Sequence, residues 1–275
     1  MITHTDLKIS KSPTASVVAV PSIETPLDEL HRVVAPVFEA AAESSSLIAH
    51  QHPLKLRRVP FRLPKFILLG SRGGGKPMNI GLFAGFEQGN LEATRALTES
   101  LLRFRTSPSL TRDYALSTYP MVNLQGLSSI PALGDFEERY TQNATDEDVQ
   151  FFLREFRLWN FDGFISVRLD THGEGFHVKV RSDLIAREVV EPAIAAASIP
   201  LPLAAQPVRL QASHIDGQDV PPRLAPPPDV RSQPFDLELY LPPIDSPFEQ
   251  AEALYQMVAE ILRYYRTFIS HASEL

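Results

Sequence analysis

The stretch IGLFAGFEQGNLEATRAL, Ile80 to Leu97, contains a change of hydrophobic period that decides the fold class. Its first part is a short apolar run broken by glycines, which is typical of a buried strand. From Leu91 onward, apolar residues recur at the spacing of one helix face as far as Phe104. The stretch therefore predicts a strand, a loop and a helix in succession.

The same alternation continues on both sides of this stretch. Apolar or alternating runs predict strands at 65–70, 79–85, 114–123, 162–170, 175–180 and 235–241. Helical spacing predicts helices at 26–44, 91–104, 145–158, 182–198 with a break at Pro192, and from 246 to near the end. The proline-dense stretch 219–234 is expected to be a surface excursion. Strands that alternate with helices predict a three-layer α/β fold.

A glycine-rich segment precedes the opening stretch and contains G-x-x-x-x-G-K, from Gly70 to Lys76. A phosphate-binding loop requires Ser or Thr after the lysine, to bind magnesium, and then a helix whose N-terminal amides face the phosphates. Here Pro77 follows the lysine and a strand pattern follows the proline. The segment is therefore expected to be a loop between two strands and not a nucleotide site.

Length and composition limit the possible classes of protein. The 275 residues, 44% hydrophobic and 21% charged, predict a globular chain, with residues 1–20 as a partly disordered extension and 21–275 as a single domain. The net charge of −7 and the lack of a basic patch argue against nucleic acid and anionic membranes as partners. The absence of cysteine and of a long apolar segment predicts a cytoplasmic protein.

Four segments, taken in order, resemble a known family. They are IGLFAGFEQGNLEATRAL, YPMVNLQG, GFISVRLDTHGEGFHV and LELYLPP, which cover most of residues 60–270. The set resembles the zinc-carboxypeptidase-like family that includes succinylglutamate desuccinylase and aspartoacylase relatives. The resemblance implies an α/β/α fold with a mixed sheet of about eight strands. It also implies a zinc-bound water that attacks an amide carbonyl, with a glutamate as general base.

The positions that carry this chemistry in the family are substituted here. The resemblance places Glu87 and Asn90 at the first two zinc ligands, Arg168 at the third, and Tyr240 at the catalytic glutamate. The substrate-clamp region falls on Asn123 and on DFEER, where Glu137 and Glu138 stand in place of a neutral amide and a cation. Because a guanidinium repels a metal and offers no lone pair, this set is not expected to bind zinc.

Two arrangements of Glu87 and Arg168 are compatible with the sequence. The guanidinium can take the place of the metal charge by pairing directly with the carboxylate, or each side chain can point to solvent in an open cleft. In both cases the sequence predicts a non-catalytic binding or regulatory module without a cofactor. Its former active-site cleft would take a small molecule or peptide of unknown identity. The sequence does not settle the oligomeric state.

An active metal-dependent amide hydrolase is the alternative function. The stretch DTHGEGFHV brings His172, Glu174 and His177 close together in the sequence, and imidazole and carboxylate groups are zinc ligands. A relocated zinc site at these three residues would restore carboxypeptidase or deacylase chemistry. The structure can distinguish the two hypotheses by whether it brings these side chains together.

Overall fold

A computed structural model gives the structure of the protein and describes residues 26–56, 59–73, 76–127, 136–141, 145–211, 214–215, 218–219 and 235–272. The helices are α1 (Pro26–Ala42), α2 (Glu92–Thr106), α3 (Phe136–Thr141), α4 (Glu147–Trp159), α5 (Asp183–Ile185), α6 (Glu191–Ala196) and α7 (Pro247–Ala272). A 3₁₀ turn, η1 (Gln125–Leu127), and a π-helical turn, η2 (Ala186–Val190), complete the helical elements in these ranges.

Eight strands form one mixed sheet in the order β1-β2-β4-β3-β5-β10-β6-β7. They are β1 (Leu47–Leu56), β2 (Val59–Leu69), β3 (Met78–Phe83), β4 (Tyr114–Tyr119), β5 (Gly163–Leu169), β6 (Phe176–Val180), β7 (Leu203–Leu210) and β10 (Phe235–Leu241). The central strands β4, β3, β5 and β10 are parallel to one another. A two-stranded ribbon, β8 (His214–Ile215) with β9 (Gln218–Asp219), lies outside this sheet. The predicted mixed α/β sheet of about eight strands is confirmed.

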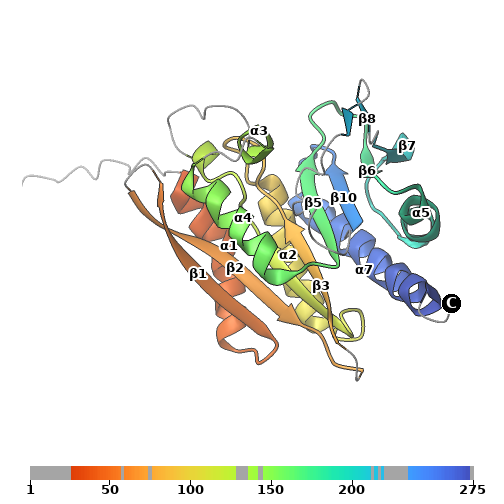
Figure 1. Ribbon diagram of the computed structural model, residues 1–275, viewed down its shortest axis with the longest axis horizontal. Coiled ribbons are helices and arrows are strands. Elements are labelled where there is room, and N and C mark those ends of the chain that lie inside the picture. The colour runs from red at the N-terminus through yellow and green to blue at the C-terminus, as the bar shows by residue number, and fades with distance from the viewer. Residues whose placement is uncertain are drawn as a thin grey trace, which may run out of the picture.

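Successive side chains of β4 show which helices cover each face of the sheet, because they alternate between the two faces. The Tyr114 hydroxyl donates to the Leu262 carbonyl of α7 at 2.6 Å, and the Tyr119 hydroxyl donates to Glu155 of α4 at 2.6 Å. Helices α1 and α2 lie on the α7 side, where α1 packs on α2 and α2 on α7. The result is a three-layer arrangement with α4 on the opposite face of the central strands (Figure 1).

Aromatic side chains fill the space between α4 and the sheet. Phe83 of β3 stacks on Tyr119 with ring centroids 5.1 Å apart, and it meets Phe156 of α4 edge to face at 5.3 Å. The helix contributes three fully or almost fully buried phenylalanines, Phe151, Phe152 and Phe156. Such a layer gives α4 its amphipathic pattern, and its burial supplies most of the stabilisation of the helix.

A polar cluster within this apolar layer, which we call the Lys65 cluster, consists of Lys65, Tyr119 and Glu155. The Lys65 ammonium of β2 and the Tyr119 hydroxyl both donate to the same carboxylate oxygen of Glu155. The side chains of Lys65 and Glu155 are 2% and 8% exposed. Burial lowers the pKa of Lys65, and the contact with Glu155 opposes that change. The Lys65 ammonium also lies 3.8 Å from the ring centroid of Trp159, at the end of α4.

The edges of the sheet differ most from the sequence prediction. Strand β1, the edge strand of the long β1–β2 hairpin, and β7 at the other edge were not predicted. Each of them contains a proline, Pro53 or Pro207, and polar residues, a composition that is typical of edge strands and weakens the strand signal. The predicted helix 182–198 is interrupted, since η2 separates α5 from α6 just before Pro192.

One predicted helix start is also wrong in detail. The helix expected at 145–158 begins after its N-cap residue, Asp146, and the carboxylate of Asp148 in its first turn binds Arg139. Among the described residues, no helix is long and apolar enough to cross a membrane.

Candidate functional site

The residues predicted to carry the site meet at one edge of the sheet. Strands β3, β5 and β10 are parallel, so their carboxyl ends, and the loops that follow them, lie together. Tyr240 of β10 lies opposite Arg168 of β5 on one side and His177 of β6 on the other. This edge is where open α/β sheets bind their ligands. The structure therefore brings Glu87, Arg168 and Tyr240 to one place.

Glu87 follows β3 and bonds to the end of β5. The backbone N–H of Leu169 donates to its Oε1 at 3.2 Å, while Oε2 is buried without a hydrogen-bond partner among the described residues. Burial raises the pKa of the Glu87 carboxyl, and the positive charge of Arg168 opposes this change. A raised pKa that arises from desolvation beside a charged group is typical of a functional cleft.

Arg168 is held from two sides. Its guanidinium lies 4.0 Å from the centroid of the Phe86 ring, and its Nε is 3.9 Å from Oε1 of Glu238 in β10. The positive charge of Arg168 also acts on the Glu87 carboxyl. Direct pairing of these two side chains stays a prediction. The Arg168 side chain is 12% exposed, so it lies mostly within the protein, which does not favour the open-cleft alternative. Glu238 was the carboxylate that the sequence interpretation overlooked.

The Asn90 side chain stabilises the start of α2. Its Oδ1 accepts a hydrogen bond from the backbone N–H of Glu92 at 2.8 Å, at the start of α2. Short polar side chains favour this position because they satisfy an amide that has no partner within the helix. The amide oxygen at the predicted second ligand position is thus engaged by the helix start.

Tyr240 links the two strands beside β10. Its hydroxyl donates to Glu238 Oε2 at 2.8 Å and accepts from the Lys179 ammonium at 3.2 Å. The His177 ring stacks on the Tyr240 ring, with centroids 4.5 Å apart and planes 5° from parallel. A continuous polar row therefore crosses β5, β10 and β6, and Glu238 lies at its centre.

The structure does not form the relocated metal site. His172 and Glu174 are exposed, and the Glu174 carboxylate pairs with Arg209. His177 is buried, and its Nδ1 lies 2.9 Å from the Gly175 carbonyl. Burial lowers the pKa of His177, although the bond to Gly175 opposes this. Across the described ranges, no group of three His, Asp or Glu side chains is placed to hold a metal ion.

Asp170 explains why these residues diverge. Its carboxylate accepts from the backbone N–H groups of His172 at 3.0 Å and Gly175 at 2.9 Å, which fixes the turn between β5 and β6. Burial alone would raise the pKa of Asp170, but the backbone hydrogen bonds outweigh it and lower the pKa. The turn directs His172 and Glu174 outward while His177 points into the sheet.

The former clamp region is organised by a residue that the sequence interpretation missed. Asn123 donates to the Phe86 carbonyl at 3.0 Å, and its Oδ1 accepts from Arg139 Nη2 at 3.2 Å. Arg139 is also bound by both oxygens of Asp148, at 3.1 and 3.2 Å. The predicted Glu137 and Glu138 belong to α3, and their side chains lie outside the described part of the chain. Arg139, the residue that follows this pair, is therefore the cation that contacts Asn123.

We expect Tyr240→Phe to lower the free energy of unfolding by about 1.5–3 kcal/mol, because the hydroxyl bonds to an ionised carboxylate. Tyr255→Phe is a matched control, since that hydroxyl bonds to neutral Ser107 Oγ at 3.0 Å. Its removal should cost about 0.5–1.5 kcal/mol. Urea unfolding measures both variants, and equal losses would contradict a charged partner for Tyr240.

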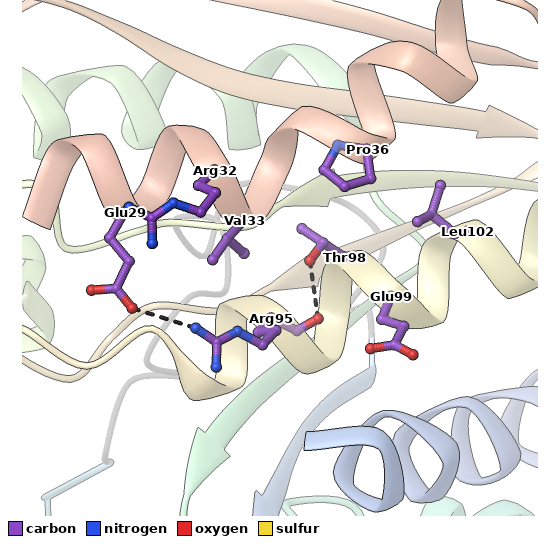
Figure 2. Close-up of a pocket in the computed structure, with 8 residues that line it drawn as sticks. All are labelled: Glu29, Arg32, Val33, Pro36, Arg95, Thr98, Glu99 and Leu102. Carbon is purple, nitrogen blue, oxygen red and sulfur yellow. Dashed lines mark hydrogen bonds and ion pairs between the residues drawn. The ribbon is translucent and has the colours of Figure 1, made fainter. Parts of the chain in front are cut away.

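A groove of about 440 Å³ lies elsewhere, between α1 and α2 (Figure 2). Val33, Pro36 and Leu102 supply its apolar surface. At one end Glu29 and Arg95 neutralise each other in an ion pair of 3.4 Å. The groove belongs to the helix layer and contains none of the residues at the carboxyl ends of the strands. We therefore place the candidate site at the sheet edge.

Comparisons with known proteins give the fold its name. No protein-family model matches the sequence. No curated protein matches it either. Among solved structures, the chain is similar to a metallo-carboxypeptidase from Burkholderia cenocepacia, with a TM-score of 0.64 and 13% identity over 85% of this chain and 68% of that one.

Two further solved structures are similar to this chain. A metallo-carboxypeptidase from Pseudomonas aeruginosa, in complex with (2-guanidinoethylmercapto)succinic acid, has a TM-score of 0.58 and 14% identity over 84% of this chain and 68% of that one. Bovine thrombin-activatable fibrinolysis inhibitor has a TM-score of 0.53 and 14% identity over 88% of this chain and 97% of that one. At such identities the likeness concerns the fold alone, and the fold of this chain is that of the metallo-carboxypeptidases.

Proposed function

We propose that this protein is a non-catalytic binding module built on a metallo-carboxypeptidase-like fold. Its cleft lies at the carboxyl ends of β3, β5 and β10. The observation that carries the proposal is the position of Arg168, which packs against the Phe86 ring and beside Glu238 where the resemblance places a zinc ligand. The ligand of the cleft would be a small molecule or a peptide.

The donor set at the cleft does not fit zinc. Zinc in hydrolases takes three nitrogen, oxygen or sulfur ligands and keeps one position open for water. Of the three positions that the resemblance assigns to zinc ligands, only Glu87 carries a suitable donor, since the Asn90 oxygen is used at the start of α2 and Arg168 offers a cation. A metal placed among them would meet electrostatic repulsion and lack ligands.

The position of the general base gives independent support. A base must hold a lone pair within reach of the proton that it takes. The Tyr240 hydroxyl instead donates its proton to Glu238 and accepts from Lys179. We therefore assign Tyr240 to the wall of the cleft. The sequence has no cysteine, which is compatible with our further proposal of a reducing, cytoplasmic environment.

Metal binding tests the proposal. We expect wild-type protein, dialysed against zinc and then freed of excess ion, to retain no stoichiometric zinc in elemental analysis by mass spectrometry. The triple variant Glu87→His, Asn90→Glu, Arg168→His should gain zinc, because it restores three donors and removes the cation. Circular dichroism must first show that the variant is folded.

The zinc contents of the wild type and of the triple variant separately test the loss of metal binding and the assignment of the ligand positions. Zinc in the variant and none in the wild type supports the assignment of the ligand positions and the loss of metal chemistry. Stoichiometric zinc in the wild type would contradict the proposal and require a donor set outside these residues. A folded variant without zinc would show that Glu87, Asn90 and Arg168 do not stand at the ligand positions.

A further inference from the structure

His52 is a half-buried titratable group at the interface between the edge strand β1 and α4. Its ring centroid lies 5.0 Å from that of Phe151 in α4. Its Nε2 is fully buried and has no hydrogen-bond partner among the described residues. The neutral ring can carry its proton on Nδ1, so only an acceptor lone pair on Nε2 remains unsatisfied. A protonated ring would instead bury an N–H donor that has no acceptor.

Three charged or titratable groups act on His52, one from each element around it. Glu155 lies on α4, Lys65 on β2, and His50 on β1 itself, with its ring centroid 6.2 Å away. Burial lowers the pKa of His52, and Lys65 and His50 lower it further, whereas Glu155 raises it. Because Glu155 already accepts from Lys65 and Tyr119, its charge is largely compensated at this point.

We propose that protonation of His52 releases α4 from the β1 edge of the sheet, which makes the docking of this helix sensitive to mild acid. The charged ring would bury an N–H donor without an acceptor, and it would be repelled by the Lys65 ammonium. Moving α4 away lets water reach Nε2 and accept its hydrogen bond. The closed arrangement therefore belongs to the neutral form of His52.

Loosening of α4 would extend to the candidate cleft through a series of hydrogen bonds. Asp148, in the first turn of α4, binds Arg139, which in turn donates to Asn123. Asn123 donates to the Phe86 carbonyl, immediately before Glu87. The release of α4 stands independently of the proposed function. Only its effect on ligand binding rests on that function.

The sign of the pH dependence follows from the lowered pKa. A histidine whose folded pKa lies below the unfolded value of 6.5 contributes its full stabilisation above that value. This stabilisation is lost as the pH falls from 6.5 through the lowered pKa of His52 in the folded protein. The reason is that the open form binds the proton more tightly than the closed form does. Between pH 7.5 and 5.5 the open population can rise by up to about tenfold.

Two probes read the docking of α4 in the full-length protein. The sequence has a single tryptophan, Trp159 at the end of α4, so its fluorescence reports this helix without interference. Hydrogen exchange of residues 147–159, corrected for the intrinsic effect of pH, measures the open population directly. We expect exchange in this segment to become several-fold faster at pH 5.5 than at pH 7.5, with a red shift of the emission.

His52→Phe removes the titration and keeps an aromatic ring against Phe151, and His52→Gln is a second non-titrating variant. His50→Phe is the matched control, since this exposed residue lies on the same strand. We expect the pH response of α4 in the His50 variant and its loss in whichever His52 variant folds. An equal response in a folded His52 variant, or none in the wild type, would overturn the proposal. Neither result depends on whether the cleft binds a metal.

Discussion

Replacing Glu155 by glutamine is expected to lower the free energy of unfolding by about 3–5 kcal/mol. The substitution keeps the shape of the side chain but removes the charge that compensates Lys65, which is 2% exposed. An ammonium without a counter-charge in an apolar layer has a large desolvation cost. The Tyr119 hydroxyl loses its charged acceptor at the same time. Urea unfolding, monitored by circular dichroism, gives the magnitude.

The control for Glu155 is the same substitution at an exposed pair. Glu29→Gln breaks the contact with Arg95, whose side chain is 41% exposed. It should therefore cost no more than about 1 kcal/mol. The double variant Lys65→Met, Glu155→Leu removes both charges and should recover most of the loss. A loss below 1 kcal/mol for Glu155→Gln would mean that water reaches Lys65 in the folded protein.

The second large effect is expected for Arg139→Leu, again about 3–5 kcal/mol. The Asp148 side chain is fully buried, at 0% exposure, and the bidentate contact with Arg139 satisfies both of its oxygens. Burial alone would lower the pKa of Arg139, but the hydrogen bonds with Asp148 outweigh it and raise the pKa. Without the guanidinium, an uncompensated carboxylate remains inside the protein. Unfolding in urea measures the loss.

Two further variants separate the ion pair from packing of the long arginine stem. Arg263→Leu changes the same residue type in an exposed pair with Glu260, and the loss there should stay below about 1 kcal/mol. Arg139→Leu combined with Asp148→Leu also removes the carboxylate that the single variant leaves without a partner. The double variant should therefore recover part of the lost stability. If the single and the double variant lose the same free energy of unfolding, the loss comes from the packing of Arg139 and its contact with Asn123. It would then not come from the buried carboxylate of Asp148.

The layered fold could be predicted because its central elements carry strong periodic signals. Strands β3, β5 and β10 are apolar runs bounded by loops, and α2 and α7 have clear helical spacing. The edge strand β1 could not be predicted in this way. Its pairing with β2 along the whole hairpin depends on tertiary context that one stretch of sequence does not show.

The candidate site was predictable where position depends on the backbone alone. Glu87, Arg168 and Tyr240 follow or end parallel strands, so topology brings them together. Their partners depend on side-chain geometry, and Arg168 contacts Glu238, two residues before Tyr240 on the same face of β10. The alternation of β10 together with its parallel pairing to β5 could have indicated this carboxylate. Arg139 was missed because its contacts with Asp148 and Asn123 join segments that the sequence does not place side by side.

The place of β10 in the sheet sets an order for assembly during synthesis of the chain. Strand β10 lies between β5 and β6, although both of these strands precede it in the sequence. Until a ribosome has released residues 235–241, the sheet exists as two unconnected parts, one ending at β5 and the other formed by β6 and β7. The exposed edges of β5 and β6 are then open to wrong partners. Folding therefore has to wait for the last quarter of the chain, and chaperones have their greatest opportunity to act in that interval.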